Sequence, residues 1–460
     1  MKKHISFSLS IQREIERHGL NVESEVNNSF KELGIRTLLH QAGIRKEKGF
    51  PPVTLLFVMI VLPLIKHSLC SLWSGQFFAN IIAAQKDTYY RFLNHPCFNW
   101  RKLVLLLACR EIARTDRSTL NDKTIIVDDT ILGKTGKKME LVSYHHDHTT
   151  NRSKLGYQML QLGYHNGARF YPVDFGFHTS ANQTNGRCRE LDKRCCGWKR
   201  RMESFEKKTD LMVAMLKRCW QNDISARFVL FDSWFASDAV ISKIITIGYG
   251  VLCRLKRNKT RYTYNGSPKT LAQLWHDVAR HELRWVNSWR IKAALVRVEL
   301  PLSGSVDLVF VRWNKKTWHA FLCTETDLDL AEILNYYSRR WAIECFFRDC
   351  KQLLELGKGQ SETFDAVVAW TSIVMIRYLL LVYILAKRQI IGPIGPLFKE
   401  LAHEHLQLVF IQLLWERFRQ ILMLSSQLFS PDHDPEELFY LLDVLENSFT
   451  PLPLDGCAKL

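Results

Sequence analysis

Two short apolar runs, each followed by aspartate, constrain the fold more than any other feature of this sequence. Residues 125–127 (Ile-Ile-Val) precede Asp128 and Asp129, and residues 228–231 (Phe-Val-Leu-Phe) precede Asp232. Short runs rich in β-branched and aromatic residues are typical of buried strands. A carboxylate at the end of such a strand is costly to desolvate unless it meets a cation, solvent or a hydrogen-bonded turn. The pattern predicts a mixed α/β fold with acidic groups at one sheet edge, although aspartate also often begins ordinary turns.

A third acidic residue lies in a segment that we predict to be one long helix, from about Leu328 to Leu356. At ~100° per residue, four side chains of this helix would share an arc of ~60°: Tyr337, Arg340, Glu344 and Lys351. This face spans about 21 Å at ~1.5 Å per residue, which is long enough to follow several phosphates of a nucleic acid. A solvated stripe with an Arg340–Glu344 ion pair would give the same spacing, so it is the strand-end aspartates that favour a site.

Carboxylates from two strands and one helix are suited to binding divalent metal. Mg²⁺ and Mn²⁺ prefer carboxylate oxygens and keep positions for water and phosphate. One aspartate of the Asp128–Asp129 pair, together with Asp232 and Glu344, could therefore hold two ions about 3.5–4 Å apart. Side chains alternate between the two faces of a strand, so only one member of the pair can face the metals.

The spacing Tyr-x2-Arg-x3-Glu-x6-Lys on the predicted helix resembles the signature of the DDE transposases of insertion sequence family four. The likeness spans about residues 119–390 and includes the Asp-Asp-Thr motif at 128–130 and a β-rich insertion before the glutamate. It implies an RNase H-like catalytic core. It also selects Asp129 over Asp128, because the family's aspartate is followed by threonine. The sequence departs from some relatives after Asp232, where Ser233-Trp234 replaces Arg-Glu.

The resemblance implies a transposase of an insertion sequence that cuts DNA strands and transfers them to a target. Asp129, Asp232 and Glu344 would be the catalytic residues and the ligands of two Mg²⁺ ions, for which Mn²⁺ could substitute. The signature also implies that Tyr337, Arg340 and Lys351 bind DNA. The partners would be double-stranded DNA, as terminal inverted repeats and target, and a second copy of the chain in a synaptic homodimer. A related RNase H-like DNA nuclease and a non-catalytic domesticated DNA-binding relative are the alternatives.

Changes in pattern along the chain predict a catalytic core with an insertion and helical flanks. A helical N-terminal DNA-binding domain is predicted at residues 1–118, followed by the first part of the core at 119–257. A β-rich insertion is predicted at 258–327, the second part of the core at 328–390 and a C-terminal helical region at 391–460.

The composition favours a polyanionic partner and an intracellular setting. Lys and Arg outnumber Asp and Glu by 63 to 46, a formal net charge of +17. The first residues lack the apolar core of a signal peptide, and Ala366–Ala386, although long enough to span a membrane, carries Arg377. The 12 cysteines include no Cys-x2-Cys pair. We therefore predict no membrane association and a cytoplasmic, nucleoid-associated bacterial protein.

Overall fold

The computed structural model describes residues 24–66, 68, 84–147, 151–312, 314, 317–407, 414, 418 and 421. The chain divides into two compact units, Asn94–Val382 and a second unit that combines Met1–Leu93 with Tyr383–Leu460.

The larger unit is built on a mixed sheet whose central strands have the order β4-β3-β1-β5-β6. The first three strands are antiparallel, whereas β5 runs parallel to β1 and β6 runs parallel to β5. Their bounds are β1 (Thr124–Gly133), β3 (Arg152–His165), β4 (Phe170–His178), β5 (Phe228–Phe231) and β6 (Gly250–Leu255). A short strand, β2 (Ser143–Asp147), pairs with the beginning of β3. This arrangement confirms the mixed α/β prediction and agrees with an RNase H-like core.

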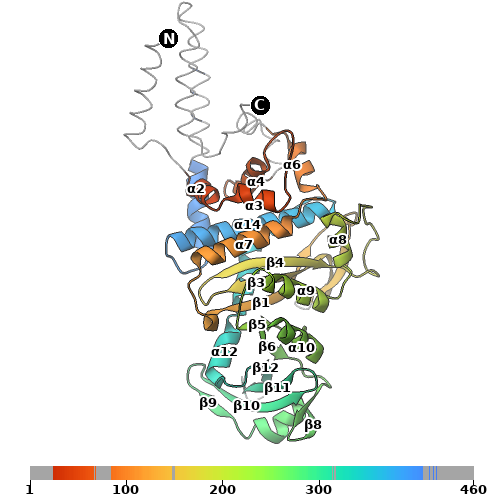
Figure 1. The fold of residues 1–460 in the computed structure, drawn as a ribbon, viewed down its shortest axis with the longest axis vertical. Coiled ribbons are helices and arrows are strands. Elements are labelled where there is room, and N and C mark those ends of the chain that lie inside the picture. Colours follow the sequence, from red (N-terminus) through yellow and green to blue (C-terminus); the bar gives the residue numbers. More distant parts are fainter. Residues whose placement is uncertain are drawn as a thin grey trace, which may run out of the picture. The chain divides into compact units, whose positions relative to one another are not determined.

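The β-rich segment after β6 extends the same sheet. Strand β12 (Trp318–Cys323) pairs antiparallel with β6, and the order then continues through β11, β10, β7 and β8. Figure 1 shows β10 and β11 at the opposite end of the sheet from β3 and β4. The remaining elements of this segment are β7 (Arg261–Tyr264), β8 (Ser267–Thr270), α11 (Leu271–Leu274), the π-helical turn η2 (Trp275–Ala279), β9 (Arg284–Val286), β10 (Ile291–Leu300) and β11 (Gly304–Arg312).

Helices cover both faces of the central strands. On one face, Asp174 of β4 accepts hydrogen bonds from Arg101 of α7 (Trp100–Thr115) and Arg218 of α9 (Lys208–Trp220). On the other face, the Phe170 ring of β4 lies 5.0 Å from the Phe346 ring of α13 (Trp341–Gln352). The sheet therefore separates α7 and α9 from α13. Helices α8 (Cys196–Glu203) and α10 (Asp238–Ile247) complete this part of the unit.

The segment predicted as one helix from Leu328 to Leu356 is two helices, α12 (Leu330–Ser338) and α13, separated by a turn. At the break, Arg339 donates to the carbonyl of Asp122 at 2.8 Å, which ties the turn to a distant part of the chain. Its guanidinium also lies 4.6 Å from the centre of the Tyr336 ring, three residues earlier. Arg339 and Arg340 keep right-handed helical dihedral angles, so the turn interrupts the helix between Tyr337 and Glu344 without reversing the direction of the chain.

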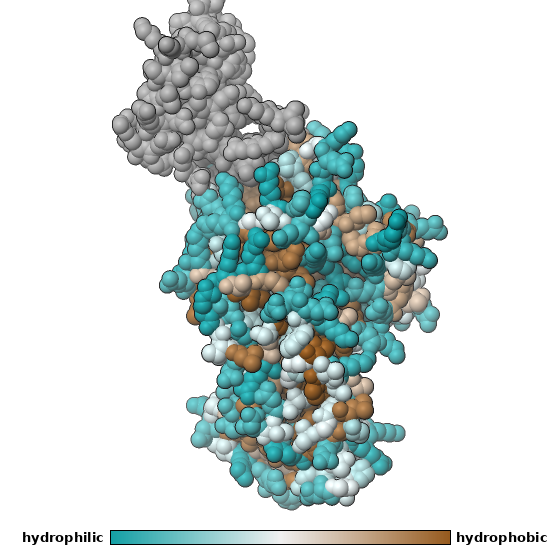
Figure 2. All heavy atoms as spheres, in the orientation of Figure 1, coloured by the Kyte–Doolittle hydropathy of each residue, from teal (hydrophilic) through white to brown (hydrophobic). Residues whose placement is uncertain are grey.

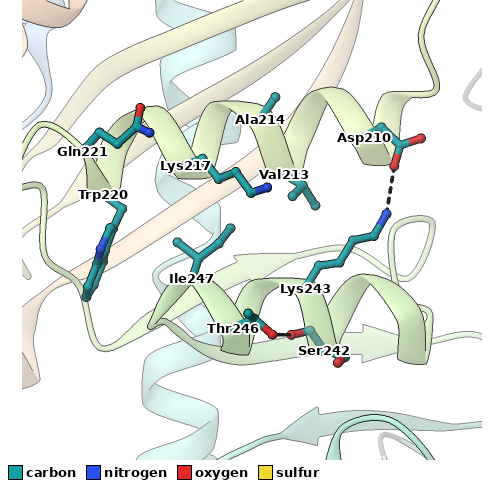
Figure 3. A pocket seen from close by; sticks show the side chains of 10 residues that line it. All are labelled: Asp210, Val213, Ala214, Lys217, Trp220, Gln221, Ser242, Lys243, Thr246 and Ile247. Carbon is teal, nitrogen blue, oxygen red and sulfur yellow. Dashed lines mark hydrogen bonds and ion pairs between the residues drawn. The ribbon is translucent and has the colours of Figure 1, made fainter.

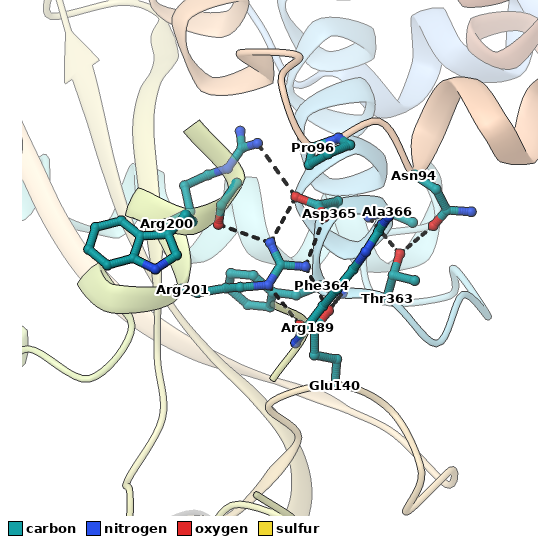
Figure 4. A network of polar contacts seen from close by, with 12 residues as sticks. Asn94, Pro96, Glu140, Arg189, Arg200, Arg201, Thr363, Phe364, Asp365 and Ala366 are labelled. Atoms are coloured by element: carbon teal, nitrogen blue, oxygen red, sulfur yellow. Dashed lines mark hydrogen bonds and ion pairs between the residues drawn. The ribbon is translucent and has the colours of Figure 1, made fainter. Parts of the chain in front are cut away.

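Helix α14 (Phe364–Lys387) backs α13, and a buried ion network fixes where α14 begins. Arg201 of α8 donates to Glu140 at 2.7 Å and to Asp365 at 2.8 Å, and its side chain is fully buried. Glu140 also accepts the backbone N–H of Phe364 at 2.8 Å (Figure 4). Helix α14 is long and apolar enough to cross a membrane, but 94% of its most apolar window is buried inside the protein, as in a core helix.

The described part of the smaller unit is helical. Its helices include α2 (Glu25–Glu32), α3 (Ile35–Gln41), α4 (Pro52–Val61) and α6 (Lys86–Leu93), and residues 394–407 are helical as well. Glu32 pairs with Lys387 at 2.7 Å, which ties α2 to the last residue of α14.

The face of the molecule visible in Figure 2 is mainly hydrophilic over the described residues.

Candidate active site

Strand β1 directs Asp128 and Asp129 to opposite faces of the sheet. Asp128 Oδ2 accepts a hydrogen bond from Arg340 Nη1, next to α13, at 3.0 Å. Asp129 Oδ2 accepts from Lys208 Nζ, on α9, at 2.5 Å and from Gln158 Nε2 at 2.8 Å. These contacts do not agree with the prediction that Asp129 faces Glu344. Alternation along the strand puts the two side chains on opposite faces, and the contact with Arg340 shows that Asp128 is the one on the α13 face.

Asp128 lies close to the second predicted aspartate. Asp232 follows the last residue of β5, which is the parallel neighbour of β1. Burial raises the pKa of the Asp128 carboxyl to about 7, and the negative charges of Asp129 and Asp232 add to this effect, although Arg340 opposes it. Asp128 is therefore a buried carboxyl group for which Arg340 compensates only in part, and such perturbed carboxyl groups are often found at functional sites.

Arg340 joins Asp128 to Glu344. The Arg340 guanidinium donates to Asp128 with one nitrogen and to Glu344 Oε1 with the other. Glu344 lies in the first turn of α13, where the N-terminal end of the helix dipole favours a carboxylate. The guanidinium thus provides the positive charge between the two carboxylates.

The remaining signature residues lie on the same face of the sheet as Asp128. Lys351 Nζ donates to Thr130 Oγ1 at 2.6 Å, so Arg340 and Lys351 contact alternate residues of β1. The Tyr337 ring packs 4.6 Å from the Phe321 ring of β12, and burial raises the pKa of its hydroxyl. The structure therefore brings Asp232, Glu344, Arg340, Lys351 and Tyr337 together around Asp128 and leaves Asp129 on the other face.

The donor set fits a hard divalent cation, but the side chains are not arranged to hold one as they stand. Among the described residues, no three His, Cys, Asp or Glu side chains are grouped closely enough to bind a metal ion. Asp128, Asp232 and Glu344 supply the carboxylate oxygens that Mg²⁺ and Mn²⁺ prefer. Glu344 would have to exchange the Arg340 guanidinium for the metal.

The sequence analysis assigned no role to Lys208 and Gln158, which donate to Asp129, or to Trp234, whose ring lies against Lys208. Lys208 Nζ lies 3.6 Å from the centre of the Trp234 ring as well as against Asp129. One signal in the sequence could have marked Lys208, because it is a cation in the first turn of a helix, where the dipole disfavours positive charge.

A groove between α9 and α10 contains none of the predicted site residues. It is lined by Lys217, Trp220 and Ile247 among others, and Lys243 pairs with Asp210 there at 3.1 Å (Figure 3). The carboxylates described above lie elsewhere in the unit.

Two models of protein families match the chain. The model described as "DDE superfamily endonuclease" matches residues 78–274, and the model described as "Transposase DDE domain" matches residues 206–380. The first match includes Asp128, both include Asp232, and the second includes Glu344. No curated protein matches the chain. Among solved structures, the Drosophila P element transposase strand transfer complex is similar at 10% identity with a TM-score of 0.22. The match covers 98% of this chain and 86% of that chain.

Proposed function

We propose that this chain, which matches models of DDE endonucleases and transposases, is the transposase of an insertion sequence, with Asp128 in place of the predicted Asp129 as its first catalytic aspartate. One observation carries the choice of residues. Arg340 and Lys351, both from the signature, contact the face of β1 that holds Asp128, beside Asp232 and Glu344.

DDE transposases in general depend on divalent metal. In this proposal Asp128, Asp232 and Glu344 hold two Mg²⁺ ions, for which Mn²⁺ can substitute. When bound, such ions activate the attacking oxygen and stabilise the leaving oxygen of a phosphodiester. Arg340 and Lys351 hold phosphates near the cut. Tyr337 contacts the DNA backbone. Its ring packs on Phe321, which fixes the start of the turn between α12 and α13 that contains Arg340.

The proposed partners are the double-stranded terminal inverted repeats of the element and its target DNA. The net charge of +17 supports a polyanionic partner. From the resemblance we also propose that the protein forms a homodimer that holds two element ends. Its proposed location is the cytoplasm of a bacterium, in association with the nucleoid.

A cleavage and strand-transfer assay with paired element ends tests this function. Glu344→Gln is expected to retain binding to the ends and to lose Mg²⁺-dependent nicking. Nicking by this variant would show that Glu344 is not catalytic. Metal-dependent cutting without strand transfer in the wild type would identify a nuclease, and end binding without cutting would identify a non-catalytic relative.

The same assay separates the two aspartates. Asp128→Asn is expected to abolish nicking, whereas Asp129→Asn is expected to retain it at a reduced rate. The reverse order would restore Asp129 as the catalytic residue.

A further inference from the structure

Lys208 connects two segments that each carry a proposed catalytic aspartate. Its ammonium group lies 2.5 Å from Asp129 Oδ2 and 3.6 Å from the centre of the Trp234 ring. Asp129 is next to Asp128 on β1, and Trp234 lies two residues after Asp232 in the loop that follows β5. One side chain of α9 therefore contacts the middle of β1 and the loop after β5 from the face of the sheet opposite Glu344.

The position of Lys208 is unfavourable without these partners. Its side chain is only 8% exposed, and burying an ammonium group without a counter-ion is costly. It is also the first residue of α9, where the helix dipole disfavours a cation. Asp129 and the Trp234 ring provide the compensation, as an ion pair and as a cation–π contact.

Asp129 also needs Lys208. Its carboxylate is 25% exposed and follows directly after Asp128, so an unpaired charge there would repel the neighbouring carboxylates. The pair with Lys208 neutralises Asp129 and leaves the other face of the strand to Asp128.

We propose that Lys208 is a positioning residue, which holds Asp128 and Asp232 at the separation needed for divalent metal by binding Asp129 and Trp234 behind them. Asp129 is then the anchor of Lys208 and not a metal ligand. This inference rests on the proposed function, because it assumes that Asp128 and Asp232 bind metal.

Titration of the full-length protein with Mn²⁺ in the absence of DNA, followed by calorimetry, tests this role. Lys208→Met is expected to weaken Mn²⁺ binding by about 10- to 100-fold, the usual effect of losing a residue that orients metal ligands. Lys208→Arg is expected to restore binding to within about 10-fold of the wild type, because Arg can keep both the ion pair and the ring contact. Lys217→Met on the exposed side of the same helix is the matched control and is expected to bind Mn²⁺ as the wild type does.

A double variant separates positioning from metal ligation. Asp129→Asn combined with Lys208→Met leaves no unpaired buried charge, so it is expected to bind Mn²⁺ more tightly than Lys208→Met alone. If Asp129→Asn abolishes Mn²⁺ binding as completely as Asp128→Asn, or if Lys208→Met binds Mn²⁺ as tightly as the wild type, the inference is overturned. Thermal melting of each variant identifies any that fail to fold, and the Lys208→Arg result then decides.

The two proposals fail in different ways. A wild-type protein that binds Mn²⁺ but never cuts DNA contradicts the transposase function. The Mn²⁺ titrations of the variants still test the positioning role of Lys208 in that case.

Discussion

At the scale of single residues, Asp128 links catalysis to stability. Its pKa is raised from 3.8 to about 7 by burial and by the charges of Asp129 and Asp232. The folded protein therefore binds a proton more tightly than the unfolded chain between these two values, and the metal-free protein loses stability as the pH rises from about 4 to 7. Asp128→Asn stays neutral and avoids this loss. With a metal chelator at pH 8, we expect the variant to be more stable by about 1–2 kcal/mol, measured by chemical denaturation. Equal stability of the variant and the wild type at pH 8 would contradict the prediction.

Glu111 of α7 is a buried acid that the proposed function does not use. Among the described residues, neither of its carboxyl oxygens has a hydrogen-bond partner, and burial raises its pKa well above 4.5. Glu111→Met is expected to stabilise the protein by about 1–3 kcal/mol at neutral pH, because it removes an unsatisfied polar group. Because the pKa of Glu111 is raised in the folded protein, the stability of the wild type falls as the pH rises above about 4.5. The stability difference between Glu111→Met and the wild type therefore increases with pH. Urea unfolding at pH 5 and pH 8 measures both effects. A less stable variant would indicate that the carboxyl group has a partner.

At the scale of elements, the network at the start of α14 predicts a large and specific loss of stability. Arg201→Met leaves the Glu140 carboxylate buried without its counter-ion and leaves Asp365 with only the longer contact to Arg200 at 3.9 Å. We expect a loss of about 3–5 kcal/mol in the free energy of unfolding. Adding Glu140→Gln and Asp365→Asn to this variant removes the buried charges and is expected to recover part of the loss. Arg194→Met is the control, because the Arg194–Asp192 pair is 92% and 52% exposed and exposed pairs contribute little.

The elements also show which features the sequence could predict. Apolar runs ending in aspartate predicted β1 and β5, because burial and β propensity act locally. The expectation that the aspartates end their strands is correct for Asp232 but wrong for Asp128 and Asp129, because β1 continues to Gly133. The break between α12 and α13 could not be predicted, since it depends on bonds from Arg339 and Arg340 to distant parts of the chain. The choice between Asp128 and Asp129 depended on which face of β1 is covered by α13, and alternation alone leaves that open. Lys208 belongs to no motif, and only the tertiary structure brings it to Asp129.

At the scale of the whole molecule, the β-rich segment and the core form one sheet, because β12 pairs with β6. This pairing also places Phe321 of β12 against Tyr337 of α12. The sequence predicted the segment as an insertion, but strand partners across 70 residues cannot be identified from propensity alone. The continuity means that the insertion supports the α12–α13 turn directly.

The net charge of +17 attracts DNA to the whole chain, so a direct phosphate contact has to be distinguished from the effect of net charge. If Lys351 contacts a phosphate, Lys351→Gln is expected to lower the slope of log affinity against log salt by about 1, and to weaken specific and non-specific DNA about equally. Fluorescence anisotropy with end DNA from 50 to 300 mM KCl, with Ca²⁺ replacing Mg²⁺ to prevent cutting, measures this slope. Lys217→Met removes the same charge from the α9–α10 groove, away from the carboxylates, and is expected to leave the slope unchanged. If both variants lower the slope equally, the effect comes from net charge alone, and Lys351 does not hold a phosphate.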